Sequence, residues 1–288
     1  MFSIILPAYR ERGVCNLVEK LLSERPAKSM RLEKIIVVEC ECKDSARLRT
    51  IAKKFRRKVK IIEERTRRGK ASSINAALTK TGADIIVMES ADTFPRKGTL
   101  AALLKPFRKS NVGMVAGRPV PTNDRRNFIG FLSHTVWALH HIISLDVPKA
   151  GEVVAFRRVF GRMPANVVAD ESYIEFAVRK AGYRIVYAPG AVVYNKGPSS
   201  LSNFVKQRKR VFLGHMQAKK EFGYSVSTMD SFRVAGAMLE YAMSGGVSSP
   251  KEVMWATAAI AVECWARLTG AFDFHVLKRV PYKWEATK

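Results

Sequence analysis

Short apolar runs alternate with helix-patterned segments through residues 1–90, and this alternation limits the folds open to the chain. The runs are SIILPAY (3–9), KIIVVE (34–39), VKII (59–62) and ADIIVME (83–89), and segments with apolar residues at helical spacing separate them. Continuous Ile and Val runs joined by such segments are typical of βαβ units, whose parallel strands are buried on both faces. We therefore expect an α/β fold around a mostly parallel sheet.

Polar residues follow each run, where open parallel sheets bind their ligands. PAYRER (7–12) ends the first run, ECECKD (39–44) the second and ESADTFP (89–95) the fourth. Each also has a purely structural interpretation, with Asp44 as a helix N-cap and Asp92 as a turn residue. No glycine-rich dinucleotide loop or P-loop follows any run, which argues against oxidoreductases and P-loop enzymes.

The chain is strongly basic, with 50 Lys plus Arg against 25 Asp plus Glu and a formal charge of +25. Such a charge predicts an anionic partner: nucleic acid, an acidic membrane surface or a phosphorylated substrate. A basic nucleic-acid-binding protein is one alternative, although the sequence contains no recognisable DNA or RNA module. The four cysteines form no CxxC pair, so neither a zinc site nor a disulfide framework is predicted.

Seven segments now identify a resemblance: IILPAYRE, IIVVEC, RRGKASSINAAL, IIVMESADTFP, VVADE, AGYRIVYAP and QRKRV. In this order, over residues 1–215, they resemble the inverting nucleotide-sugar glycosyltransferases of family two. QRKRV resembles the QxxRW motif of the cellulose, chitin and hyaluronan synthases. In length the chain is similar to small archaeal membrane mannosyltransferases that extend lipid-linked glycans. The resemblance implies a Rossmann-like GT-A catalytic domain over 1–225 and a helical, membrane-associated region over 226–288.

The resemblance implies a donor site made of residues at the strand ends. Pro7, Tyr9 and Glu11 match the segment that holds the nucleobase. Glu39 matches the acid that accepts a hydrogen bond from the base or ribose. Lys70 matches a cation at the donor site, where its point charge suits a diphosphate.

The metal ligand implied by the resemblance is Asp92, the second aspartate of the DxD motif. This chain reads SAD, so Ser90 stands where the family has the first aspartate. Mg²⁺ commonly takes only one or two protein carboxylates and completes its shell with phosphate oxygens and water. We therefore expect a divalent cation, Mg²⁺ or Mn²⁺, between Asp92 and the donor phosphates.

Asp170 matches the family's catalytic base. Inverting transfer is a single displacement at the anomeric carbon and requires one base on the acceptor side. Adjacent Glu171 is expected to help hold the acceptor or to favour the helix N-terminus electrostatically. The structural alternative makes Asp170 the N-cap of a helix that ends at Gly182.

The acceptor side is implied by QRKRV and by AGEVVAFRR. Gln207 is expected to bond the acceptor, and Arg210 to stabilise the charge of the leaving diphosphate. Val211 replaces the family tryptophan and removes a stacking platform, which argues against long processive synthesis. Arg157 and Arg158 are candidates to meet an acceptor phosphate.

Three apolar stretches raise the question of a membrane: 127–145, 234–247 and 253–272. The last reaches spanning length but contains Glu263 and Arg267, which can pair at i, i+4. We expect the last two stretches to form a hairpin around SGGVSSP, attached to the membrane. The alternative is two soluble amphipathic helices that close the domain.

The basic residues around QRKRV and at the C-terminal end bear on the same question. Lys206, Arg208 and Lys209 are interpreted as a solvated face that also suits anionic lipid headgroups. Lys278, Arg279 and Lys283 fit positive-inside anchoring. These patterns place the expected catalytic domain on the cytoplasmic side of the cell membrane.

The resulting hypothesis is an inverting, β-forming glycosyltransferase that moves a hexose from a nucleotide donor to a lipid-linked, dolichyl-type glycan. GDP-mannose is favoured by the resemblance, and UDP-glucose or UDP-N-acetylglucosamine is the alternative donor. No nucleic-acid partner is expected under this hypothesis. A catalytically inactive scaffold is a further alternative, motivated by Ser90 and Val211.

Overall fold

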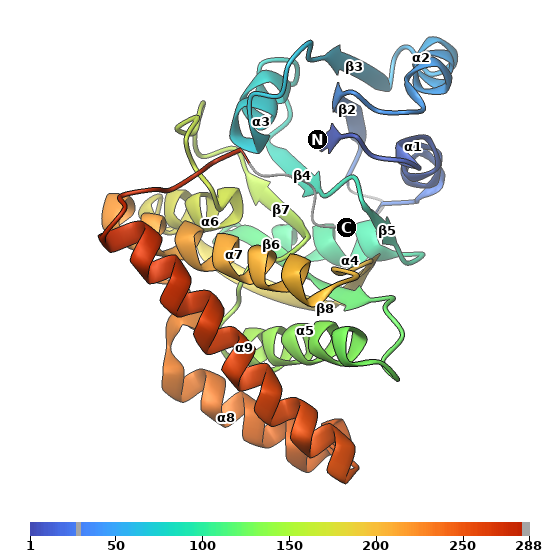
Figure 1. Cartoon of the computed structure of the whole chain (residues 1–288). Coiled ribbons are helices and arrows are strands. Elements are labelled where there is room, and N and C mark those ends of the chain that lie inside the picture. The colour runs from blue at the N-terminus through green and yellow to red at the C-terminus, as the bar shows by residue number, and fades with distance from the viewer. Residues whose placement is uncertain (27–29, 284–288) are drawn as a thin grey trace. The chain divides into compact units, whose positions relative to one another are not determined.

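The computed structural model describes residues 1–26 and 30–283 (Figure 1). The strands are β1 (Phe2–Tyr9), β2 (Leu32–Cys40), β3 (Val59–Glu63), β4 (Ile85–Glu89), β5 (Thr93–Pro95), β6 (Val112–Pro121), β7 (Val153–Arg157) and β8 (Arg184–Asn195). The helices are α1 (Val14–Ser23), α2 (Ser45–Lys54), α3 (Lys70–Leu78), α4 (Thr99–Leu104), η1 (Lys105–Arg108), α5 (Phe128–Asp146), α6 (Asp170–Lys180), α7 (Leu201–Phe222), η2 (Ser227–Met229), α8 (Ser231–Tyr241), η3 (Ala242–Gly246) and α9 (Pro250–His275).

These elements belong to two compact units that interleave along the chain. The first comprises Met1–Pro119, Ala150–Asn166 and Ile174–Asn195, and the second comprises Val120–Lys149, Val167–Tyr173 and Lys196–Lys288. The C-terminal region predicted over 226–288 lies wholly within the second unit.

Within the described residues, the strands form one sheet in the order β3-β2-β1-β4-β7-β6-β8-β5. β1 pairs in parallel with β2 and β4, and β2 pairs in parallel with β3. β7 is antiparallel to β4 and β6, and β5 is antiparallel to β8. The prediction of parallel strands is therefore confirmed for the first four, but the sheet as a whole is mixed. A strand buried on both faces has the same apolar pattern in either direction, so its pattern does not specify direction.

The first four strands are covered by helices on both faces, as the alternation predicted (Figure 1). Phe2, Ile4 and Leu6 lie in a buried cluster with apolar residues of α1, α2 and α4. Because side chains alternate along a strand, Ser3 and Ile5 point to the other face, which α3 covers. There Thr81, which follows α3, donates a hydrogen bond to the Ser3 hydroxyl at 2.8 Å.

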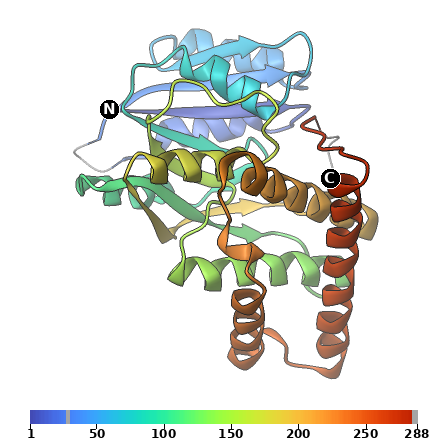
Figure 2. The ribbon, with the colours of Figure 1, turned by 90° about the vertical axis from the view of Figure 1, so that its left-hand side faces the viewer.

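The second unit is helical in its described part (Figure 2). α5 packs against α8 and α9, and α7 packs against α9. Gly270 allows close approach of α9 to α7, since a Cβ placed there would lie 2.8 Å from the Phe212 ring. The two helices predicted around SGGVSSP form, and η3 and a short turn connect them.

Charged side chains connect α7 to α9. Arg208 donates two hydrogen bonds to Glu263, at 2.8 and 3.1 Å, and Arg267 donates to the same carboxylate at 2.8 Å. The i, i+4 pair predicted for Glu263 and Arg267 is confirmed. The solvated interpretation of Arg208 and Lys209 is wrong, because Lys209 also forms an ion pair with Asp273 at 2.7 Å.

α5 has the length and composition of a membrane span. Among the described residues it alone combines such length with a mean hydropathy of 1.3 and few charges. Its Phe131, Leu132 and Ile143 are buried inside the structure. A core helix of a soluble protein meets the same criteria, so this finding is weak evidence for a membrane.

Replacing Glu263 with glutamine tests the ion pairs between α7 and α9. Burial acts to raise the pKa of Glu263, but the charges and N–H groups of Arg208 and Arg267 outweigh it and hold the pKa at about 2, below the usual 4.5. A lowered pKa means that the carboxylate stabilises the fold fully above pH 4.5 and loses this contribution as the pH falls towards 2. We expect Glu263→Gln to lower the free energy of unfolding at neutral pH by about 2 kcal/mol and to reduce its loss in acid.

Thermal unfolding followed by circular dichroism as a function of pH measures both effects. Glu240→Gln, at an exposed acid of α8, is the matched control and should leave stability at neutral pH unchanged. If wild type and Glu263→Gln lose stability equally in acid, the ion pairs do not contribute as described.

Candidate active site

The polar residues predicted for the donor site follow strands of the first unit that run in parallel. Tyr9 ends β1 opposite Cys40 of β2, and Glu39 lies opposite Ala8. β4 runs parallel to β1, so the turn that contains Asp92 leaves the sheet at the same edge. The structure thus brings Tyr9, Glu39 and Asp92 to one edge of the sheet, as the sequence predicted.

The Tyr9 ring already contacts two arginines. The Arg67 guanidinium lies 4.2 Å from the ring centroid, and that of Arg10 lies 5.1 Å away. Both distances are within the range of cation–π attraction. Arg67 was not among the predicted site residues, although the basic run RTRRGK contains it. A nucleobase that stacks on this face of Tyr9 must displace Arg67 or stack on its guanidinium.

An ion pair connects the ends of β1 and β2. Arg10 and Glu41 both adopt positive φ, 54° and 56°, which side-chain-bearing residues adopt at a cost. The Arg10 Nε donates to Glu41 at 2.7 Å, and the Arg10 backbone N–H donates to the Cys40 carbonyl at 3.0 Å. Because the ion pair is exposed it adds little stability, and it connects the two strand ends without holding them rigidly.

Two carboxylates close the loop that follows β2. Glu39 is buried and accepts from the backbone N–H of Cys42 at 3.2 Å, which leaves its second oxygen for the predicted bond to base or ribose. Asp44 occupies the N-cap position of α2 but does not cap that helix with its side chain. It accepts instead from the Gly13 N–H at 3.2 Å, so it connects the loops after β1 and β2.

α3 begins at Lys70 and carries a second residue that the sequence analysis missed. Gly69 precedes it with φ of 98°, a conformation that favours glycine. Further along α3, the Asn75 amide donates to the Met163 carbonyl at 2.8 Å and accepts from the Met163 N–H at 2.9 Å. Asn75 lies inside the quoted motif RRGKASSINAAL, but its partner is 88 residues away, so only the structure could identify the role.

Asp92 lies in a tight turn between β4 and β5. The Thr93 N–H donates to the Ser90 carbonyl at 3.1 Å, and the Ser90 N–H donates to the Glu152 carbonyl at 3.1 Å. Between residues 1 and 283, apart from 27–29, no group of three or more His, Cys, Asp or Glu could hold a metal ion. The residues of this turn therefore fit a cation that binds together with a diphosphate and takes one carboxylate ligand from the protein. They do not fit a cation enclosed by protein ligands.

In the second unit, Asp170 is buried and begins α6. The Tyr173 N–H donates to the Ala169 carbonyl at 3.2 Å, so Ala169 occupies the N-cap position and Asp170 the first helical position. The N-cap interpretation of Asp170 is therefore wrong by one residue. With Glu171 it supplies two acids to the first turn, where the helix dipole favours negative charge. The predicted Gly182 cap is confirmed, because Gly182 has φ of 81° and follows the last turn of α6.

α7 supports the segment that carries Asp170. The Gln217 side chain accepts from the Val168 N–H at 3.0 Å and donates to Glu221 at 3.1 Å. A Cβ placed on Gly214 would lie 2.7 Å from the Ala169 Cβ, so the two backbones approach closely. The sequence contains two glutamines, and the resemblance implied a role for Gln207 rather than for Gln217.

The residues predicted to bind the acceptor, together with Arg210, predicted to stabilise the leaving diphosphate, have different surroundings. Gln207 and Arg210 are three residues apart on α7 and half-buried, so they share one face of the helix. In the first unit, Arg157 donates to the carbonyls of Val112 and Phe107, and Arg158 donates to the Thr81 carbonyl at 2.7 Å. Both guanidinium groups thus hold backbone segments together, and an acceptor role for either stays a prediction.

A methyl group added at Gly214 tests the support that α7 gives to the Asp170 segment. We expect Gly214→Ala to push Ala169 away, to lower the free energy of unfolding by about 1–3 kcal/mol and to speed hydrogen exchange at the Val168 amide. Gly236→Ala is the matched control, because nothing lies within 4 Å of a Cβ placed on that glycine of α8. Unchanged exchange at Val168 in Gly214→Ala would contradict the proposed support.

Comparison with solved structures identifies related folds. The mannosyltransferase PcManGT from Pyrobaculum calidifontis, solved in complex with GDP-Man and Mn²⁺, superposes with a TM-score of 0.63 at 21% identity and covers 96% of this chain and 88% of its own. GalNAc-T7, solved with UDP, GalNAc and Mn²⁺, gives a TM-score of 0.54 at 11% identity over 84% of this chain and 58% of its own. At these identities the likeness establishes the fold, which is of the GT-A type.

Comparison of sequences identifies the family. An N-acetylglucosaminyltransferase of Azorhizobium caulinodans is 24% identical over 164 residues, which are 50% of this chain and 41% of that protein. The poly-β-1,6-N-acetyl-D-glucosamine synthase of Staphylococcus aureus is 23% identical over 221 residues, 72% of this chain and 53% of that protein. The chain thus spans about half the length of the curated relatives it matches. The model of glycosyl transferase family 2 matches residues 3–168, more than half of the sequence, and the chain belongs to this family of glycosyltransferases.

Proposed function

We propose that this glycosyltransferase transfers a hexose from a nucleotide-sugar donor to a lipid-linked glycan with inversion at the anomeric carbon. The observation that carries the proposal is the Asp170 carboxylate, buried in the first turn of α6 and supported by Gln217 and Gly214 of α7. The contacts at Val168 and Ala169 fix the backbone that carries this carboxylate, and a general base requires such a fixed position.

Donor binding is assigned to residues of the first unit. Tyr9 and Arg67 offer stacking surfaces to the nucleobase, and Glu39 has an oxygen available for the base or ribose. Lys70 at the start of α3 supplies positive charge and a helix N-terminus for the diphosphate. A divalent cation held by Asp92, when bound, would neutralise charge that develops on the leaving diphosphate.

Proton removal and acceptor binding are assigned to residues of the second unit. The Asp170 carboxylate accepts the proton of the acceptor hydroxyl while that oxygen bonds to the anomeric carbon and the bond to the diphosphate breaks. Arg210 stabilises negative charge, and Gln207 and Glu171 orient the acceptor. No covalent enzyme intermediate forms, because one displacement inverts the centre.

The donor has two candidates, each supported by one comparison. GDP-mannose is favoured by the fold neighbour PcManGT, which was solved with GDP-Man and Mn²⁺. UDP-N-acetylglucosamine is favoured by the curated relatives, an N-acetylglucosaminyltransferase and a poly-N-acetylglucosamine synthase. Val211 at the position of the family tryptophan favours the addition of single sugars over polymer synthesis.

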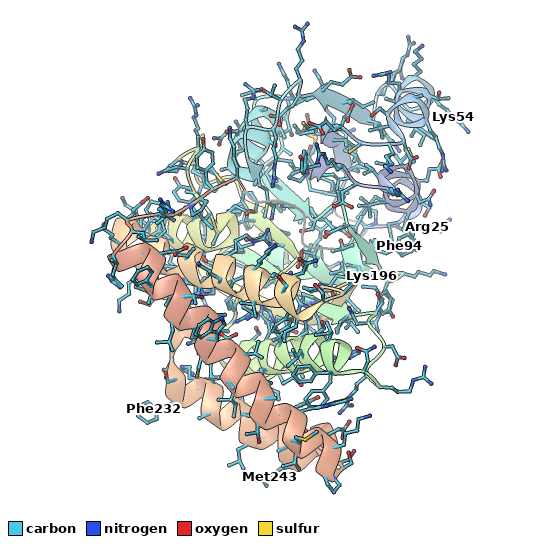
Figure 3. All side chains as sticks on the ribbon, in the orientation of Figure 1. Arg25, Lys54, Phe94, Lys196, Phe232 and Met243 are labelled. Atoms are coloured by element: carbon cyan, nitrogen blue, oxygen red, sulfur yellow. The ribbon has the colours of Figure 1, made fainter. Side chains whose placement is uncertain are left out.

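We further propose that α8 and α9 attach the protein to the cytoplasmic face of a membrane with anionic lipids. What supports this is a set of exposed apolar side chains: Phe232, Leu239, Met243, Val253, Met254, Ile260, Trp265, Leu268 and Phe272. Figure 3 shows Phe232 and Met243 projecting away from the helices. Exposed apolar groups of this number mark an interaction surface.

Charge favours a bilayer as the occupant of this surface. Arg233 and Lys251 lie in the first turns of α8 and α9, and Lys278, Arg279 and Lys283 follow α9. Basic residues beside exposed apolar side chains are typical of interfacial helices on anionic lipids. The net charge of +25 adds long-range attraction to such a surface.

Two substitutions separate donor binding from proton transfer. We expect Asp92→Asn to weaken binding of the donor's nucleoside diphosphate in Mn²⁺ by at least about tenfold, because it removes the carboxylate assigned to the cation. Asp170→Asn should leave this affinity unchanged and lower the transfer rate by about 10²–10⁴-fold. Calorimetry with GDP and UDP, and transfer assays with GDP-mannose and UDP-N-acetylglucosamine, measure both effects and decide the donor.

Asp84→Asn is the control for these variants, because Asp84 is exposed and pairs with the N-terminal amine. The donor site is wrong if neither GDP nor UDP binds wild type. The assignment of the base is wrong if Asp170→Asn transfers sugar at the wild-type rate.

Sedimentation with lipid vesicles tests the membrane proposal. We expect wild type to sediment with vesicles that contain phosphatidylserine, and less at high salt. The triple variant Phe232→Ser, Met243→Ser and Leu268→Ser should reduce sedimentation by at least about tenfold. Each apolar side chain buried in the bilayer contributes about 1.5–3 kcal/mol to binding. Phe94→Ser, at an exposed apolar residue of β5, is the matched control. Equal sedimentation of wild type and the triple variant would exclude α8 and α9 as the attachment surface.

A further inference from the structure

Glu89 is a fully buried acid next to the turn that carries Asp92. It is the last residue of β4, its exposed fraction is 0%, and it directly precedes Ser90. Its carboxyl oxygen Oε1 lies 2.9 Å from the Thr93 hydroxyl. In the described part of the chain, its other oxygen, Oε2, is buried without a hydrogen-bond partner. Neither the donor site nor the base assigned above uses this residue.

Counting hydrogens shows that the Thr93 hydroxyl cannot donate to both of its neighbours. The Thr93 hydroxyl oxygen lies 2.9 Å from Glu89 Oε1 and 2.8 Å from the Ser90 carbonyl oxygen. A hydroxyl has one hydrogen to donate, and a backbone carbonyl can only accept. If Thr93 donates to Ser90, the hydrogen between Thr93 and Glu89 must come from Glu89. The carboxyl group then is a neutral acid that donates to the Thr93 hydroxyl.

The surroundings of Glu89 favour the neutral acid for an independent reason. Burial raises the pKa of Glu89 to about 8, against the bond from Thr93 that lowers it, and the charges of Glu24 and Asp92 raise it further. Glu24 itself is paired with Lys20 at 3.0 Å and accepts from the Gly98 N–H. Both charged groups that raise the pKa of Glu89, Glu24 and Asp92, are acids. A bare carboxylate oxygen buried without a donor would cost far more than a neutral carbonyl oxygen.

The chain of bonds ends on the backbone of the turn. The Thr93 hydroxyl contacts both Glu89 and the Ser90 carbonyl, and the Thr93 N–H donates to the same carbonyl at 3.1 Å. These bonds close the turn Ser90-Ala91-Asp92 at its base. The orientation of the turn that carries Asp92 therefore depends on the buried side chain of Glu89.

We propose that Glu89 is a positioning residue: a protonated acid whose hydrogen bond through Thr93 fixes the turn that presents Asp92 to the cation and diphosphate of the donor. This inference rests on the proposed role of Asp92. As a neutral group, Glu89 adds no negative charge beside a diphosphate that carries several. Ser90, which stands in place of the family's first aspartate, likewise adds no negative charge. Asp92 is therefore the one charged residue of the turn Ser90-Ala91-Asp92.

Infrared spectroscopy decides the protonation state directly. At about pH 6, between the usual carboxyl pKa and that of Glu89, we expect wild type to show the C=O stretch of a protonated carboxylic acid, and Glu89→Gln to lack it. The band should disappear as the pH rises through about 8. If Glu89→Gln removes only carboxylate bands at this pH, the proposal is overturned.

Glu33→Gln is the matched control for the spectra. Burial acts to raise the pKa of Glu33, but hydrogen bonds from Thr81, Gly82 and Ser3 outweigh it and lower the pKa. Glu33 therefore is ionised at the same pH, and Glu33→Gln should leave the protonated band in place. Loss of the band in this variant would assign it to Glu33 and overturn the proposal.

Hydrogen exchange tests the positioning without any ligand. Glu89→Gln keeps a donor for Thr93 and should leave exchange at the Thr93 amide as in wild type. Glu89→Leu keeps the volume but removes the donor, and should speed exchange there by about tenfold or more. Equal exchange in Glu89→Leu and wild type overturns the positioning role even if the infrared band is present.

Donor binding is a separate readout. In the presence of Mn²⁺, we expect Glu89→Leu to bind the nucleoside diphosphate about tenfold more weakly and Glu89→Gln to bind it as wild type does. Failure of wild type to bind GDP or UDP would refute the proposed function. The infrared and exchange measurements would still decide whether Glu89 is a neutral acid that holds the turn.

Discussion

Parallel pairing of β1 with β2 and β4 is the constraint on which the candidate donor site depends. In a parallel sheet buried on both faces, polar groups can lie only at the strand ends. The carboxyl ends of neighbouring parallel strands lie at the same edge of the sheet. Tyr9, Glu39 and Asp92 reach one edge for this reason, although more than 80 residues separate the first from the last. The bonds among the loops, such as Arg10 to Glu41, then refine an arrangement that strand direction has already determined.

Local periodicity predicted this part of the fold well, because each element there carries its own signal. β1 to β4 and α1 to α3 were all expected, and the structure differs from the prediction mainly at their ends. Strand direction in β5 to β8 could not be predicted, since the pairs that set it, such as Phe94 with Tyr194 and Met114 with Phe156, join residues far apart in the chain. Arg208 and Lys209 were misinterpreted for a similar reason. A basic residue on a helix becomes part of an ion pair only when another helix brings an acid, here Glu263 or Asp273.

The residues missed by the sequence analysis are polar groups whose partners are distant in the chain. Asn75 bonds Met163 across 88 residues, and Gln217 bonds Val168 across 49. Such bonds fix loops rather than regular elements, so they produce no period and no short motif. A loop has no hydrogen-bond ladder of its own, and a side-chain amide that both donates and accepts supplies the missing bonds.

The turn of Asp92 carries less negative charge than the family pattern implies. Ser90 replaces a carboxylate in the turn of Asp92, and Glu89, argued to be neutral, adds none. Lys70 and Arg67 lie in the segment that leads into α3. A nucleoside diphosphate is repelled by every additional carboxylate and attracted by every cation, so a turn with a single charge needs less compensation from a metal ion than one with two. A single carboxylate in this turn and the cations near α3 would therefore act in the same direction on a bound diphosphate.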